Sequence, residues 1–103
     1  MSEPLPIEIS ALAAAQVRTA ETWWRLNRPK APGAIRAELE RASSLIAVQP
    51  QIGTHARAVA LRGVRRLHLA GIRYDLYYRL IETPRRLEIL AFWHASRGKL
   101  PPI

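Results

Sequence analysis

The chain has 103 residues, of which 49% are hydrophobic, which suits one domain over residues 1–103 and excludes a disordered tail. It has no cysteine, which excludes a disulfide scaffold, a thiolate nucleophile and a cysteine-based zinc site. The formal net charge is +8 at pH 7. No apolar run approaches the roughly 18 residues of a membrane span, and the N-terminus does not resemble a signal peptide. We therefore expect a basic cytoplasmic protein.

The first predicted element is a short strand over residues 5–9, where apolar and polar residues alternate. Pro4 and Pro6 favour an edge position in the sheet, because proline has no backbone N–H to donate to a neighbouring strand. Ser10 can cap the helix that follows, predicted from Ala11 to Leu26. One face of this helix is apolar and carries Ala13, Val17, Ala20 and Trp24.

A segment rich in proline over residues 27–33 ends the first helix, and a second amphipathic helix is predicted over residues 33–48. Two such helices joined by a short break should pack as an antiparallel pair against a common neighbour. On the first helix, Glu21 and Arg25 lie one turn apart, which predicts an ion pair between them.

The second half of the chain has the period of strands. Residues 54–63 have no firm period and are predicted to be loop, whereas strands are predicted over 64–69, 72–81 and 86–93, with a turn at 70–71. The predicted fold is therefore α+β with the order β-α-α-β-β-β, an N-terminal helical hairpin packed on one face of a mostly antiparallel four-stranded sheet. The expected core includes Leu39, Ile46, Leu67, Leu76, Tyr78 and Ile89.

The positive charge is concentrated in the C-terminal half. Residues 51–103 carry ten basic and three acidic residues, whereas residues 1–50 carry six and five. Most of the cations are arginines, whose planar guanidinium suits bidentate contacts with carboxylate or phosphate. The pattern predicts either a solvated surface or a half that faces a polyanion, which could be nucleic acid or an acidic protein.

The polar face of the strand over 72–81 is the first candidate site. Together with two arginines of the preceding strand it forms a basic face, although a half-solvated sheet would have the same pattern. We expect Asp75 to pair with one of these arginines, because an unpartnered charge there would be costly. The basic face comprises Arg65, Arg66, Arg73, Asp75, Tyr77 and Arg79.

Two further groups of residues are candidates. His94 and Arg97 follow the last strand; a histidine there suits general-base chemistry, and the plainer alternative is a strand-end histidine bonded to a nearby carbonyl. Of the tryptophans, Trp24 and Trp93 are expected in the core and Trp23 at the rim of a partner site. Glycine-rich phosphate loops and metal-ligand spacings are absent from the sequence, so we expect no cofactor and no metal.

Four segments in this order and separation resemble the RelE/ParE toxin superfamily of bacterial type II toxin–antitoxin modules. They cover residues 45–53, 63–66, 74–79 and 89–98, so the resemblance spans essentially the whole chain. It implies a growth-inhibiting toxin that a co-expressed antitoxin holds inactive. The antitoxin's acidic C-terminal segment would wrap the toxin, with helices over the helical hairpin, and the charge complementarity would steer association.

The superfamily divides into two branches. RelE-like members cut mRNA in the ribosomal A site, with cations that stabilise the charge developing on the phosphate. The resemblance places their basic pair on Arg66 and His68, while their third-strand arginine falls on Asp75, which has the wrong charge. Arg97 could substitute for their C-terminal arginine and His94 for a C-terminal histidine of some relatives, but their C-terminal tyrosine has no counterpart.

ParE-like members lack this set and are described as inhibitors of DNA gyrase. The departures favour a ParE-like toxin, an interaction protein without catalysis of its own; a RelE-like ribosome-dependent mRNA endoribonuclease is the alternative, and a plain nucleic-acid-binding domain is the third reading. In the ribonuclease reading the catalytic residues are Arg66, His68, His94 and Arg97. The residues expected to bind the antitoxin or the target are Trp23, Arg65, Arg66, Arg73, Tyr77, Arg79, His94 and Arg97.

Overall fold

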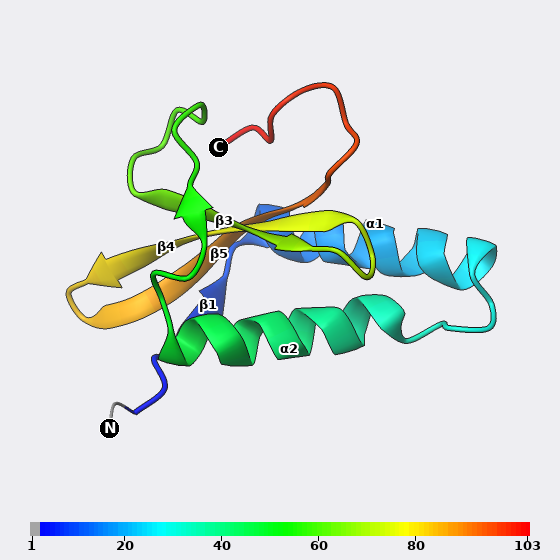
Figure 1. Cartoon of the computed structure of the whole chain (residues 1–103), viewed down its shortest axis with the longest axis horizontal. Coiled ribbons are helices and arrows are strands. Elements are labelled where there is room, and N and C mark those ends of the chain that lie inside the picture. The colour runs from blue at the N-terminus through cyan, green and yellow to red at the C-terminus, as the bar shows by residue number, and fades with distance from the viewer. Residues whose placement is uncertain (1–2) are drawn as a thin grey trace.

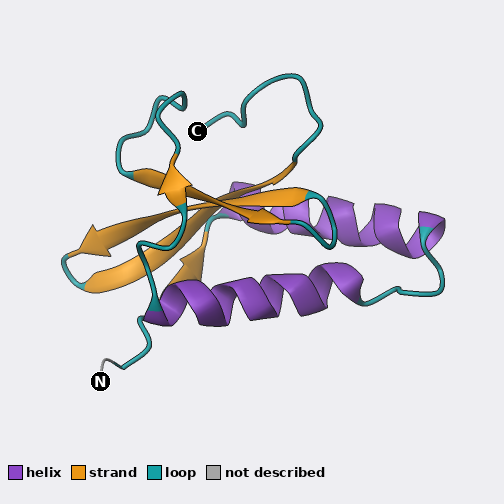
Figure 2. Cartoon of the chain, in the orientation of Figure 1, coloured by secondary structure: helices purple, strands orange, loops and turns teal. Residues whose placement is uncertain are grey.

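The computed structural model describes residues 3–103, which form two helices and five strands. In chain order the elements are β1 (Ile7–Ile9), α1 (Ala11–Asn27), α2 (Ala34–Val48), β2 (Thr54–His55), β3 (Val64–Leu69), β4 (Tyr74–Glu82) and β5 (Arg85–His94). Figure 1 and Figure 2 show α1 and α2 running in opposite directions, with α2 below the sheet. Residues of both helices pack into one core against the same face of the sheet. Neither helix of the described chain combines the length and hydropathy that a membrane span requires.

The sheet has the order β1-β5-β4-β3-β2, with β1 parallel to β5 and the other neighbouring pairs antiparallel. This confirms the α+β class, with an N-terminal helical hairpin on one face of a mostly antiparallel sheet. It also confirms the edge position of β1. The long stretch of chain between β1 and β5 is what permits them to pair in parallel.

The sheet has five strands rather than the four that the sequence predicts. The additional strand is β2, in which Thr54 and His55 lie opposite Arg66 and Arg65 of β3. The Arg65 guanidinium donates to the Gly53 carbonyl oxygen at 2.7 Å and so holds the segment before β2 against the sheet. A two-residue strand has no period to detect in the sequence, because only its pairing with β3 defines it.

The helix ends and the contact between the helices follow from polar side chains. As predicted, Ser10 caps α1, its hydroxyl oxygen accepting from the Ala13 N–H at 3.0 Å. The expected pair of Glu21 with Arg25 is wrong, because Glu21 binds Arg36 of α2 at 3.0 Å instead. The ion pair therefore joins the two helices rather than two turns of one helix.

The main core lies between the helices and the sheet. Five of the six predicted core residues are buried there, and Leu67 is partly buried against them. Tyr78 is fully buried, and its hydroxyl accepts from the Gly53 N–H and donates to the Pro50 carbonyl oxygen, both at 2.9 Å. This side chain therefore fixes the connection between α2 and β2 from within the core.

A second, smaller core covers the opposite face of the sheet, where the sequence predicts a half-solvated surface. The loop between β2 and β3 and the C-terminal tail pass over this face (Figure 1), and the Ala60 N–H donates to the Ile103 carbonyl oxygen at 3.1 Å. Tyr77 is consequently only 3% exposed. The buried members of this core are Val59, Val64, Tyr77, Leu90 and Ala91, with Ala56, Leu61, Trp93 and Ile103 packed against them.

A β-bulge in β5 divides its apolar residues between the two cores. Tyr77 lies opposite Ala91 and Tyr78 opposite Ile89, so Leu90 is an additional residue without a partner. Strict alternation would place Ala91 on the face of Ile89. The bulge places Leu90 and Ala91 together in the second core, which a two-residue period cannot predict.

Candidate functional site

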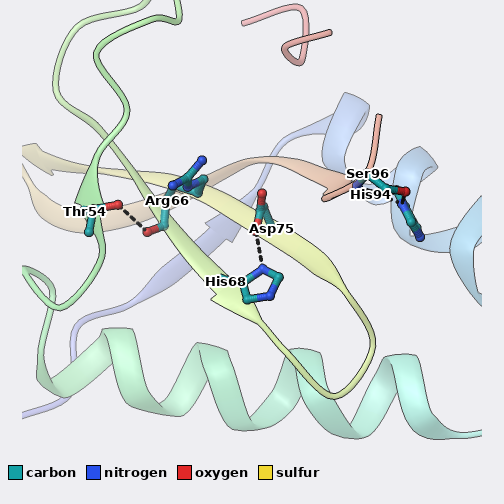
Figure 3. A network of polar contacts seen from close by, with 6 residues as sticks. All are labelled: Thr54, Arg66, His68, Asp75, His94 and Ser96. Atoms are coloured by element: carbon teal, nitrogen blue, oxygen red, sulfur yellow. Dashed lines mark hydrogen bonds and ion pairs between the residues drawn. The ribbon is translucent and has the colours of Figure 1, made fainter. Parts of the chain in front are cut away.

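The polar cluster on the face away from the helices is built by the register of β3 and β4. His68 lies opposite Asp75, and Arg66 lies opposite Tyr77. His68 Nδ1 is 2.7 Å from Asp75 Oδ1 (Figure 3), and because an ionised carboxylate only accepts, the imidazole N–H donates. The side chain of Asp75 is 10% exposed and that of His68 is 52% exposed, so the pair presents an accessible imidazole on a buried carboxylate.

The expected pairing of Asp75 with an arginine is therefore wrong. Antiparallel register places His68 directly across from Asp75, and it places Arg65 opposite Tyr78, on the helix-facing side rather than in the predicted basic face. Arg79 binds Glu88 across the β4–β5 pair at 3.0 Å, and Arg65 donates to backbone carbonyl oxygens. Within residues 3–103, Arg66 is thus the cation of this face of the sheet that has no carboxylate partner.

Arg73 lies outside the basic face in which the sequence places it. β4 begins at Tyr74 rather than Ile72, and residues 70–73 form the turn that leads into it. Arg73 has a φ of 61°, a left-handed backbone conformation that is unusual for a residue with a side chain. Its carbonyl oxygen accepts from the Ala95 N–H at 2.9 Å, which holds the turn against the end of β5.

His94 lies on the helix-facing side, opposite Tyr74 of β4, with its ring at 5.0 Å in an edge arrangement. Its Nδ1 accepts from the Ser96 N–H at 3.2 Å and is 2.7 Å from the Ser96 hydroxyl (Figure 3), so the neutral ring carries its proton on Nε2. This contact replaces the expected bond to a carbonyl. The structure thus places His94 on the other face of the sheet from Arg66 and His68.

The three tryptophans differ in exposure, and one of them carries an arginine over its ring. Arg97 lies over the Trp93 ring at 4.2 Å, which is cation–π geometry. Trp23 is 47% exposed, whereas Trp24 and Trp93, both predicted in the core, are partly buried against the two cores.

Arg28 lies near the other two tryptophans, although sequence reasoning overlooked it. Its guanidinium lies 5.8 Å from the Trp23 ring and 6.0 Å from the Trp24 ring. A signal was available, because Arg28 follows Trp24 by one helical turn just before the helix-breaking Pro29.

The three tyrosines of β4 are expected to make the fold sensitive to alkali. Burial is the main cause that raises the pKa of Tyr74, Tyr77 and Tyr78 above the ordinary 10.0; for Tyr77 the Asp75 charge adds to it and Arg66 opposes it. A raised pKa contributes stability that is complete below the unfolded pKa and is lost as pH rises through the folded one. The free energy of unfolding should therefore fall above about pH 10.

Urea unfolding between about pH 8 and pH 11 measures this loss, and Tyr78→Phe provides the comparison. Because phenylalanine does not titrate, the variant should lose less stability across this range than the wild type, although it begins less stable. An equal pH slope in both proteins would contradict the assignment to Tyr78.

Groups of three histidine, cysteine, aspartate or glutamate side chains that could hold a metal ion do not occur within residues 3–103.

Comparisons with known proteins identify the family. No curated protein sequence matches this one. A solved structure described as the chromosomal ParDE TA system from P. aeruginosa has a similar fold, with a TM-score of 0.72 and 20% identity over 92% of this chain and 100% of that chain. A family model described as the ParE toxin of the type II toxin–antitoxin system parDE matches residues 7–98. The match spans almost the whole chain and confirms the resemblance in its ParE-like branch: the chain belongs to the ParE toxin family of type II toxin–antitoxin systems.

Proposed function

We propose that this type II toxin arrests growth by inhibiting DNA gyrase in the cytoplasm, and that a cognate antitoxin with an acidic C-terminal segment neutralises it. The observation that carries the proposal is the ParE family match over residues 7–98. The similar P. aeruginosa structure is described as a ParDE system, which supports a paired antitoxin. The net charge of +8 is complementary to an acidic partner.

The arrangement of the polar residues supports an interaction protein rather than a nuclease. Cleavage of RNA through its 2′-hydroxyl needs an acid–base group and cations around one phosphate. Arg66 and His68 lie on one face of the sheet and His94 on the other, so this set does not converge. A buried carboxylate, Asp75, lies beside Arg66 and His68, where it disfavours a bound phosphate.

One observation favours the alternative, a RelE-like mRNA endoribonuclease. His68 is oriented by the buried Asp75 and is about half exposed, as a general base would be. His68→Asn separates the two functions, because asparagine can still donate to Asp75 but cannot exchange a proton. The ribonuclease reading expects this variant to lose growth arrest and mRNA cleavage, whereas the gyrase proposal expects unchanged arrest with intact mRNA.

Purified gyrase acting on relaxed plasmid tests the proposal directly. We expect the protein to inhibit supercoiling and to trap cleaved DNA, which protease treatment releases as linear plasmid. Prior addition of the protein encoded by the neighbouring reading frame should prevent both effects. Complete supercoiling and no linear plasmid at a large molar excess of toxin would contradict the gyrase target.

A further inference from the structure

A cleft runs between the C-terminal half of α1 and the adjoining ends of β4 and β5. It consists of two hollows of about 410 and 200 Å³ that share Tyr74 and His94 as lining residues. The larger hollow is walled by Trp24 of α1, by Arg28 at the C-terminal cap of α1 and by Arg73 of the β3–β4 turn. We call this depression the arginine cleft.

The arginine cleft is cationic without internal neutralisation. Arg28, Arg73 and Arg97 line it, and no aspartate or glutamate does. In the described part of the chain five other arginines form ion pairs with carboxylates, but these three do not. Glu38 approaches the backbone of this turn at Gly71, yet its carboxylate is paired with Arg41. Guanidinium groups without a carboxylate partner in their own chain are suited to bind an anion from another molecule.

One of the residues that line the cleft, Trp24, carries an unsatisfied donor. Among the side chains that the structure describes, the indole Nε1 of Trp24 is the buried nitrogen or oxygen that lacks a hydrogen-bond partner. The Nε1 of Trp93, by contrast, donates to the Lys99 carbonyl oxygen at 2.9 Å. A buried N–H without an acceptor is unfavourable, and an incoming oxygen would satisfy it.

The backbone of Arg73 is a third observation, independent of the charges. Its φ of 61° would suit glycine or asparagine at lower conformational cost, yet the position carries an arginine at the mouth of the cleft. Strained residues of this kind are found where function requires a particular side chain.

An apolar band beside the cleft indicates the class of partner. The outer side of α1 exposes 40% of Leu12, 47% of Trp23 and 73% of Leu26. Trp23 belongs both to this band and to the cleft. A protein segment that carries acidic and apolar side chains complements both features, whereas a nucleic acid backbone offers only the negative charge.

We propose that the arginine cleft receives a carboxylate side chain from the acidic segment of the antitoxin. Arg28 and Arg73 bind the carboxylate, the Trp24 indole N–H donates to it or to a neighbouring carbonyl oxygen, and apolar residues of the same segment pack on Trp23 and Leu26. This inference rests on the proposed function, because it takes the antitoxin as the partner.

Antitoxin affinity of toxin variants tests the proposal, with the full-length toxin and the full-length protein encoded by the neighbouring reading frame. Arg28→Gln and Arg73→Gln should each weaken binding about tenfold and flatten its salt dependence. Arg25→Gln is the matched control: it removes the same charge from the same helix end, outside the cleft, and should bind within about twofold of the wild type.

The indole N–H resonances provide a second readout that a purely structural role would not move. On addition of antitoxin, the Trp24 Nε1–H should shift downfield, while the Trp93 Nε1–H, already bonded, should shift little. Trp24→Phe assigns the resonance and, if its thermal unfolding shows that it remains folded, should weaken binding about fivefold through loss of the N–H.

The possible results distinguish a failure of this inference from a failure of the proposed function. Tight binding by the wild type, with equal affinity for Arg28→Gln, Arg73→Gln and Arg25→Gln and an unmoved Trp24 resonance, overturns the inference and leaves the proposed function intact. No binding of the neighbouring protein to the wild type contradicts the proposed antitoxin and this inference with it.

Discussion

Phe92→Ala is expected to lower the free energy of unfolding by about 3–5 kcal/mol, a large share of the total for a domain of this size. Phe92 is 2% exposed in the helix-facing core, and its ring stacks on Tyr74 at 4.6 Å between centroids. Alanine removes the ring and leaves a cavity that the fixed helices and sheet cannot close. Urea unfolding followed by tryptophan fluorescence measures the loss.

Phe92→Leu is the control for this prediction, since it retains most of the apolar volume. It should cost less than half as much as the alanine variant. The backbone N–H of residue 92 donates to the Gln16 side-chain oxygen at 2.7 Å. Both variants keep this hydrogen bond, because it does not involve the side chain of residue 92. A loss below about 1 kcal/mol for Phe92→Ala would contradict the packing described for this core.

Gly53→Ala is expected to destabilise the fold by about 1–3 kcal/mol. A Cβ at this position would lie 2.8 Å from the Tyr78 hydroxyl oxygen and 2.9 Å from the Arg66 carbonyl oxygen. These two oxygen atoms cannot move away easily, because the Tyr78 side chain is fully buried and the Arg66 backbone is part of β3. The variant should also weaken the hydrogen bond from residue 53 to Tyr78 and loosen β2.

Gly98→Ala provides the comparison in the same denaturation experiment. A Cβ at Gly98 meets no atom within 4 Å, so the change should stay within about 0.5 kcal/mol of the wild type. If Gly53→Ala proved as stable as Gly98→Ala, the close approach of β2 to the core would be wrong.

Both helices, the three long strands, the α+β class and the family were predictable from the sequence. Periodicity is a local property, and α1, α2, β3, β4 and β5 are long enough to display it. β2 was missed because two residues carry no period. The bulge at Leu90 and the second core were missed because they depend on the pairing of β4 with β5 and on the path of the C-terminal tail.

The sequence indicated which residues were candidates for a functional site, but it did not predict which of them lie together in the fold. Asp75 binds His68 rather than an arginine because register, which the sequence pattern does not specify, places them opposite each other. His94 shares no face with Arg66, and Arg28 enters a cleft with Arg73 only because α1 packs beside the β3–β4 turn.

The sequence by itself determined the two helices and the three long strands, the excess of positive charge and the membership of the ParE family. Only the tertiary structure decided which charges are neutralised and which remain available. Arg79 and Arg86 pair with Glu88 and Glu8 across neighbouring strands, whereas Arg28 lies near two tryptophan rings and Arg73 lines an open cleft. The reason is that ion pairing acts over a few ångströms, so it depends on which distant segments the fold brings together.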